Sequence, residues 1–154
     1  VESSSYSLLR FFNDGSIKLE GYHRQKDQTF PKKEHLKRKK LIDLLFKQGQ
    51  KVSAYPLLLF YTQAPLFEED VVIQAGFSVA KRNHKLAVTR NRLKRLMREV
   101  YRKNKLCFQT NELTFAFMFI YTGREEVSYI ELEKAMLKLI SKFNSKVSAG
   151  SDDI

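Results

Sequence analysis

The amino-acid sequence predicts an α/β protein, a sandwich of one β-sheet and three helices in a single domain. The length of 154 residues suits one domain with its own core. Apolar residues make up 43% of the chain, which is too many for a disordered protein. Segments of helical period also alternate with segments of strand composition, in the order helix, strand, strand, helix, strand, helix.

The first half of the chain contains one predicted helix and two predicted strands. The helix is expected over Lys33–Gln48, because its composition favours a helix and Gly49 follows as a C-terminal stop. The strands are expected at Leu57–Thr62 and Val71–Ala80, on either side of a loop that contains Pro65.

The second half contains a helix, a strand and a helix. The segment Ala87–Lys105 has apolar residues at helical spacing. Leu113–Tyr121 is apolar at both alternating sets of positions, which is typical of a strand covered on both faces. The last helix is expected over Ser128–Asn144, with Ser128 and Glu131 spaced as a capping box.

Both ends of the chain are expected to lie outside the domain, which we place at residues 29–146. Residues 1–28 show no sustained period and predict a poorly ordered N-terminal extension, with a short strand around Ile17–Leu19. Residues 147–154 are small or polar for the most part and predict a flexible tail.

Several classes of function are disfavoured by composition. A lone Cys107 excludes a disulfide framework and a multi-cysteine zinc site, and the three histidines are scattered, with His84 expected in a surface loop. We find no catalytic triad, phosphate-binding glycine loop or clustered carboxylates, so we expect no catalytic residue and no metal site in the polypeptide. The chain has no apolar run of about 18 residues and no signal pattern, which predicts a cytoplasmic protein without a membrane partner.

Positive charge is concentrated in two stretches. The chain has 28 Lys and Arg against 17 Asp and Glu, a net charge of +11. Lys81–Lys105 carries eleven basic residues and only Glu99 as an acid, so its net charge is +10. Lys32–Lys51 carries a net charge of +6. Charge this concentrated predicts a polyanionic partner, the alternative being a solvated helix face.

The predicted helix over Ala87–Lys105 is amphipathic at about 100° per residue. Its apolar stripe consists of Leu93, Leu96, Met97, Val100 and Tyr101. Its polar side carries Asn91, Lys94, Arg95, Arg98 and Arg102. We expect the apolar stripe to dock on the sheet and the cationic side to face solvent, where the planar guanidinium of arginine grips phosphate at two points.

The same window resembles the signature of the protein subunit of bacterial ribonuclease P, VAKRNHKLAVTRNRLKRLMRE at Val79–Glu99, centred on an Arg-Asn-Arg motif. FPKKEHLKRKKLIDLLFKQG (Phe30–Gly49) is similar to the first helix of that family, and SYIELEKAMLKLISKF (Ser128–Phe143) to its last helix. The resemblance implies a mixed sheet of about four strands with three helices, a left-handed β-α-β crossover and a fold like domain 2 of ribosomal protein S5.

The resemblance also implies a function, the removal of the 5′ leader from precursor tRNA by endonucleolytic cleavage. The RNA subunit, with Mg²⁺ that it mainly binds itself, would do the chemistry, and the protein would need no obligate protein partner. The residues implied to contact the RNA subunit are Arg90, Asn91, Arg92, Lys94, Arg95 and Arg98. Those implied to line a cleft for the leader are Ile42, Phe46, Leu58, Phe60, Ser78, Lys81 and Arg82. Ile42 departs from the family, which commonly has Phe there, and Phe46 and Phe60 could instead be core residues.

Three other functions stay open at this stage. A ribosomal or other structural RNA-binding protein shares the cationic helix but needs no cleft for a leader. A DNA-binding module could use the helix in a major groove, although helix-turn-helix folds lack a long apolar strand such as Leu113–Tyr121. A binder of anionic membranes would need the apolar stripe that the core already uses.

Overall fold

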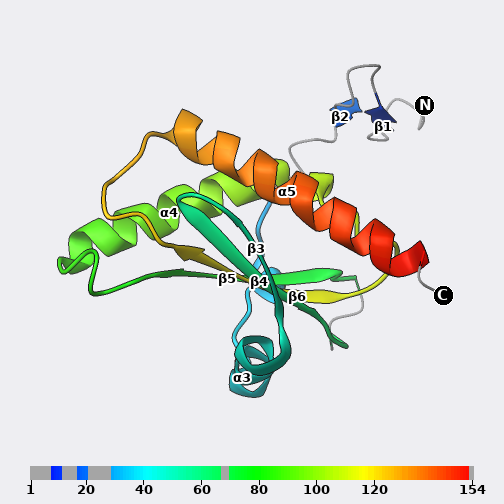
Figure 1. The fold of residues 1–154 in the computed structure, drawn as a ribbon, viewed down its shortest axis with the longest axis horizontal. Helices are drawn as coiled ribbons and strands as arrows, with labels where there is room; N and C mark the ends of the chain where they lie inside the picture. The colour runs from blue at the N-terminus through cyan, green and yellow to red at the C-terminus, as the bar shows by residue number, and fades with distance from the viewer. Residues whose placement is uncertain (1–7, 12–16, 21–28, 67–69, 153–154) are drawn as a thin grey trace.

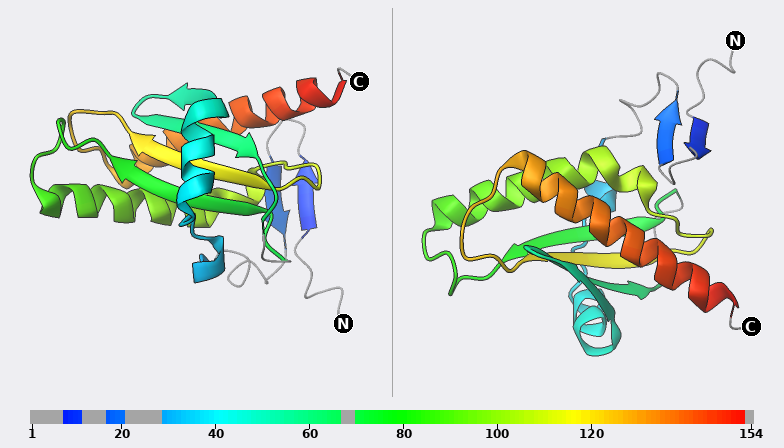
Figure 2. Two further views of the ribbon diagram at one scale, coloured as in Figure 1. Left: turned by 90° about the horizontal axis from the view of Figure 1, so that it is seen from below. Right: turned by 45° about the horizontal axis from the view of Figure 1, so that its top comes forward.

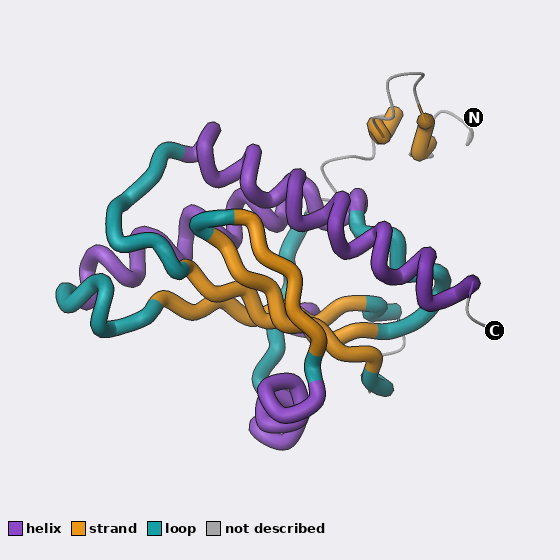
Figure 3. The backbone as a smooth tube through the Cα atoms, in the orientation of Figure 1, coloured by secondary structure: helices purple, strands orange, loops and turns teal. Residues whose placement is uncertain are grey.

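The computed structural model describes residues 8–11, 17–20, 29–66 and 70–152. Figures 1 and 3 show its helices and strands. In chain order these elements are β1 (Leu8–Phe11), β2 (Ile17–Glu20), the 3-10 helix η1 (Lys32–Glu34), α3 (Lys39–Gln48), β3 (Gln50–Ala54), β4 (Leu57–Gln63), β5 (Ile73–Val79), α4 (Ala87–Asn104), η2 (Lys105–Cys107), β6 (Phe115–Tyr121) and α5 (Tyr129–Asp152).

The main sheet has four strands in the order β3-β4-β6-β5. The β3-β4 and β4-β6 pairs are antiparallel and the β5-β6 pair is parallel, which confirms the predicted mixed sheet with three α-helices. The β5-α4-β6 connection is the predicted crossover, and its left-handedness stays a prediction. Sequence patterns did not locate β3, because this edge strand buries only Val52 and Ala54 and is otherwise polar.

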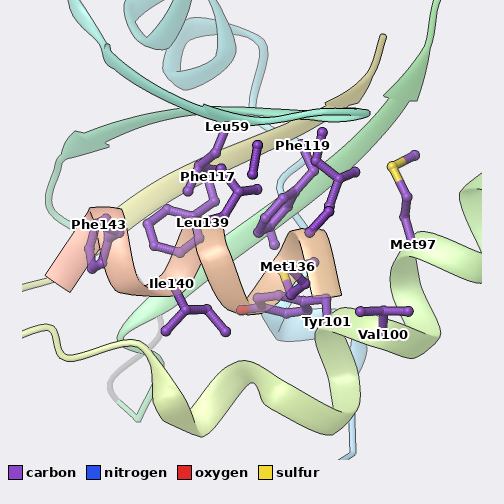
Figure 4. Packing of buried hydrophobic residues seen from close by; sticks show 14 of the residues in the cluster. Leu59, Met97, Val100, Tyr101, Phe117, Phe119, Met136, Leu139, Ile140 and Phe143 are labelled. Atoms are coloured by element: carbon purple, nitrogen blue, oxygen red, sulfur yellow. The ribbon is translucent and has the colours of Figure 1, made fainter. Parts of the chain in front are cut away.

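Helices cover the two faces of the sheet unequally (Figure 1). On one face, α4 and α5 enclose a large core that includes Leu59, Phe117, Phe119 and Phe143 (Figure 4). On the other face, α3 packs over a smaller cluster formed with β6, and we call this the α3 face. In the left view of Figure 2, α3 crosses the strands, and β5 and β6 extend beyond it toward their carboxyl ends.

The first helix is shorter than predicted, since α3 begins at Lys39 and not at Lys33. Residues 35 and 36 instead run alongside β5: His35 forms a parallel bridge with Ala75, and the Leu36 amide donates to the Ala75 carbonyl at 3.0 Å. Leu36 is buried in the smaller cluster between α3 and the sheet. Pairing with a distant strand therefore outweighs the helix preference of this basic segment.

The last helix is longer than predicted, since α5 continues past Asn144 to Asp152. Val147 packs against the main core, which extends the apolar stripe of the helix by one turn. The predicted flexible tail from residue 147 is therefore helical as far as residue 152, while residues 153 and 154 lie outside the described part. The serine half of the predicted capping box is confirmed, as the Glu131 amide donates to the Ser128 hydroxyl at 3.3 Å. The Glu131 carboxylate accepts from the Ser128 hydroxyl at 3.4 Å, and its bond to the Ser128 amide stays a prediction.

Two short strands near the N-terminus, β1 and β2, pair antiparallel. β2 confirms the strand predicted around Ile17–Leu19. The rest of the expected extension, residues 1–7, 12–16 and 21–28, lies outside the described residues. Among the helices of the described part, none is long and apolar enough to cross a membrane.

Candidate nucleic-acid interface

The start of α4 is fixed by the loop that precedes it. His84 is buried, and its Nε2 lies 2.8 Å from the Gly123 carbonyl oxygen. The expectation of a surface-loop histidine was therefore wrong, because the loop after β6 covers the ring. The Arg90 guanidinium donates to the His84 and Lys85 carbonyls at 2.8 Å each. The first arginine of the Arg-Asn-Arg motif thus holds the loop in shape.

The apolar stripe of α4 docks on the sheet as predicted. Leu93, Met97, Val100 and Tyr101 are buried in the main core. At Tyr101, burial raises the pKa of the phenol far above its ordinary value, so its hydroxyl stays neutral. The helix is therefore anchored along its length, and its remaining sides are free to carry charge.

The side of α4 that faces α5 has its cations paired. Arg92 forms an ion pair of 2.6 Å with Glu126, and Arg102 one of 2.6 Å with Glu99. Arg102 holds the pKa of the Glu99 carboxyl below its ordinary value through this hydrogen-bonded pair. Lys103 lies 5.4 Å from the ring centre of Tyr129, at the start of α5.

Other cations of α4 face solvent, and we call Lys94, Arg95 and Arg98 the α4 ridge. Arg95 and Arg98 are exposed and Lys94 is partly exposed. None of the three has an ion pair within the described part of the chain. Beside the ridge, an open depression of about 260 Å³ is lined by Val88, Asn91, Arg92 and Arg95.

The positive surface continues from the ridge toward the segment before α3. The pKa of His35 lies below its ordinary value because burial disfavours the charged ring, and Lys37 and Arg98 add positive charge nearby. His35 also contacts the Phe30 carbonyl oxygen at 3.3 Å, which works in the opposite direction. The two basic stretches of the sequence therefore meet beside β5.

The α3 face carries two rows of side chains that run across the strands. Residues paired in register share a face of the sheet. The first row consists of Ser53, Leu58, Ile120 and Ser78, and the second of Lys51, Phe60, Met118 and Gly76. Leu58, Ile120 and Ser78 are all partly exposed, so the first row lies open beside α3.

An aromatic pair joins α3 to this face. The Phe46 ring lies 5.0 Å from that of Phe60 in an edge-to-face arrangement, and Phe46 is 47% exposed. The Lys51 ammonium lies 5.6 Å from the Phe60 ring centre. A purely core role therefore fails for Phe46, while Phe60 is partly buried between the core and this surface.

The structure places five of the seven implied cleft residues on α3 or on the α3 face, and the other two beyond the end of β5. Ile42 and Phe46 come from α3, Leu58 and Phe60 from β4 and Ser78 from β5. Two exposed cations, Lys81 and Arg82, follow β5 in the turn at its end. Sequence patterns missed Ile120, which lies between Leu58 and Ser78 in the first row, because a strand that is apolar on both faces gives no sign of which residues stay exposed.

Metal ligands do not gather in the described residues, where no three His, Cys, Asp or Glu side chains come together. Apolar and aromatic surface beside cations can instead hold unpaired bases and their backbone without reading the sequence. An exposed row of arginine and lysine on a rigid helix can bind the phosphates of a folded nucleic acid. The geometry therefore supports binding at two surfaces of one domain.

Comparisons with known proteins agree on one family. The sequence model described as Ribonuclease P matches residues 30–144. The ribonuclease P protein component of Chlorobium phaeobacteroides is 40% identical over 108 residues, covering 69% of this chain and 68% of that protein. The one from Petrotoga mobilis is 27% identical over 125 residues, covering 77% and 98%.

Solved structures of the same name share the fold. The RNase P protein from Thermotoga maritima has a TM-score of 0.59 at 22% identity, covering 71% of this chain and 96% of that one. The one from Staphylococcus aureus has a TM-score of 0.56 at 17% identity, covering 70% and 93%.

Proposed function

The chain belongs to the ribonuclease P protein family, and from this membership we propose that it is the RNA-binding subunit of a bacterial enzyme that removes the 5′ leader from precursor tRNA by endonucleolytic cleavage. A protein component of ribonuclease P is one part of a ribonuclease holoenzyme and works with an RNA subunit. The proposed binding of RNA and of the 5′ leader is supported by two features of this one domain, the α4 ridge without ion pairs in the described part and a partly exposed aromatic surface on the α3 face.

The α4 ridge and the motif before it are proposed to bind the catalytic RNA subunit. Arg95 and Arg98 are exposed without carboxylate partners in the described part, so they can reach phosphates without first breaking an ion pair. Asn91 and Arg92 line the adjoining depression. When RNA binds there, the Arg92 guanidinium leaves its ion pair with Glu126 and pairs with a phosphate. Arg90 acts indirectly, since its guanidinium shapes the loop that aims the helix.

The α3 face is proposed to bind the single-stranded leader. Bases stack on the apolar and aromatic surface of Phe46, Phe60 and Leu58, while Lys81 and Arg82 hold the backbone at one end. Ile42 and Ser78 complete the surface, Ile42 with less stacking area than an aromatic ring offers. Such a surface tolerates any leader sequence, because every base has a face that stacks.

We assign the chemistry to the RNA subunit with Mg²⁺. In this proposal the protein holds no catalytic metal of its own. The polypeptide alone is then without cleavage activity. It binds substrate, offsets repulsion between two RNAs and works in the cytoplasm without an obligate protein partner.

Reconstitution tests the proposal. The protein is mixed with a bacterial ribonuclease P RNA and a precursor tRNA at low Mg²⁺, and stimulated release of the leader is the expected result. No stimulation at any protein concentration refutes it.

A matched pair of variants then tests the leader surface. Phe46→Ala should weaken binding of leader-bearing tRNA about fivefold or more, since stacking contributes about 1–3 kcal/mol per base. Its control is Leu137→Ala on α5, because Leu137 is also 47% exposed but lies on the opposite side of the sheet. Equal losses for mature tRNA and for precursor would show that Phe46 does not bind the leader.

A further inference from the structure

A row of lysines on α5 has no role in the function proposed above. Lys134, Lys138, Lys142 and Lys146 follow one another at four-residue spacing, so they lie along one side of the helix. All four are exposed. Between Glu133 and Asp152 this helix carries no acidic residue. The row is a second cationic surface, separate from the α4 ridge.

Two of these lysines converge on the edge strand β3. The Lys142 ammonium donates to the Ser53 carbonyl at 2.5 Å, and the Lys146 ammonium donates to the Lys51 carbonyl at 3.0 Å. An open depression of about 460 Å³ lies between the helix and the strand. Its lining contains no acid and consists of Lys51, Val52, Ser53, Ser141, Lys142, Ser145 and Lys146.

The position of this depression relates it to the α3 face. Ser53 and Lys51 are the β3 ends of the two rows that cross that face. A nucleic-acid strand that follows the rows from β5 passes over β6 and β4 and arrives at β3 after about 14 Å, given a strand spacing of about 4.8 Å. There it meets the lysines of α5 directly beyond the edge.

The hydrogen bonds of Lys142 and Lys146 to β3 leave donors of both ammonium groups available for a ligand. Each ammonium group has three donors. Lys142 and Lys146 each use one of them on a β3 carbonyl, and the exposed hydroxyls of Ser141 and Ser145 lie in the same depression. Lysines along an edge strand also discourage pairing with another sheet, which is the structural alternative for this row.

We propose that Lys142 and Lys146, with Ser141 and Ser145, bind the backbone phosphates of a single-stranded leader after it leaves the sheet. The leader path then runs from the turn after β5, along the first row, over β3 and onto α5. Nucleotides close to the cleavage site lie on the sheet, and those farther along the leader lie on the helix. This inference rests on the proposed function of the α3 face.

The test compares two double variants in the holoenzyme. Lys142→Gln with Lys146→Gln removes the two charges at the edge, while glutamine keeps the helix preference. Lys134→Gln with Lys138→Gln is the control, since it removes the same charge from the same helix without a contact to β3. Affinity is measured for precursor tRNAs with leaders of about 2 to about 16 nucleotides, a range that brackets the usual site sizes on single strands.

Only the long-leader substrates should lose affinity in the Lys142 and Lys146 variant. Losing two phosphate contacts, at about 0.7 per contact, reduces the slope of log affinity against log salt by about 1.4. The loss of affinity relative to the wild type should therefore be about sevenfold smaller at 200 mM than at 50 mM salt. An equal loss at every leader length and for mature tRNA would overturn the inference by placing these lysines on another part of the RNA. Unchanged affinity with increased self-association would overturn it in favour of edge protection.

The failure of the proposed function has a different signature. In that case the wild-type holoenzyme would show no dependence on leader length, and Phe46→Ala would have no selective effect on precursor. If the wild type depends on leader length and Phe46 matters while both lysine variants match the wild type, the leader surface stands and its continuation onto α5 is wrong.

Discussion

Replacing Arg95 and Arg98 together by glutamine tests the α4 ridge most directly. Both side chains are exposed, and neither has an ion pair in the described part of the chain. Their loss therefore removes no internal contact of that kind, and the buried side of α4 is unchanged. We expect the unfolding midpoint to stay close to the wild-type value and RNA affinity to fall.

The size of the expected loss of RNA affinity follows from the salt dependence of binding. Each lost phosphate contact reduces the slope of log affinity against log salt by about 0.7–0.9. If each arginine contacts one phosphate, the slope changes by about 1.4–1.8, so the affinity difference between variant and wild type shrinks about 7- to 12-fold between 50 and 200 mM salt. The assay is a binding titration with a bacterial ribonuclease P RNA at fixed Mg²⁺ and several concentrations of monovalent salt.

The matched control is Arg102→Gln with Lys103→Gln, on the same helix and with the same loss of charge. Arg102 is paired with Glu99, and Lys103 lies over Tyr129, so both are directed toward internal partners. A smaller change of slope is expected for this control. If the two double variants give the same slope, the effect belongs to overall charge, and the ridge is not a contact surface.

Three further predictions concern stability and reactivity. Leu45→Ala should lower the free energy of unfolding by about 2–5 kcal/mol in denaturant titrations, because the Leu45 side chain of α3 is fully buried in the smaller core cluster. A loss below about 1 kcal/mol would contradict this packing. Burial raises the pKa of the Cys107 thiol, so thiol reagents should modify the native protein near pH 7 far more slowly than the unfolded chain; equal rates would refute this. The folded-state pKa of His35 is lowered from 6.5, so the unfolded state takes up protons first and stability should fall as pH drops through 6.5. His35→Gln should flatten that fall, and an unchanged pH profile would exclude His35 as its source.

Local patterns in the sequence were sufficient for α4 and the capped start of α5. The apolar stripe of α4 repeats at helical spacing, so its buried side follows from neighbours along the chain. The same reasoning placed Arg95 and Arg98 on the solvent side. It also placed Arg102 with them, whereas the structure pairs the Arg102 guanidinium with Glu99 at 2.6 Å.

Residues with long-range partners were the ones that sequence patterns misjudged. His84 sits in a polar loop segment but is buried by the Gly123 loop. The helix expected from Lys33 starts at Lys39, since Leu36 pairs with Ala75 in β5. Val147 carries α5 past its predicted end by packing on a core that other elements build.

The charge windows, the amphipathic helix and the family signature are properties of consecutive residues, so the sequence alone was enough to predict a polyanionic partner and the α/β class. Strand register is different, because it is decided by hydrogen bonds between segments that are distant in sequence. Only the folded sheet put Ser53, Leu58, Ile120 and Ser78 in one row, and only the packing of α5 against β3 brought Lys142 and Lys146 to the end of it.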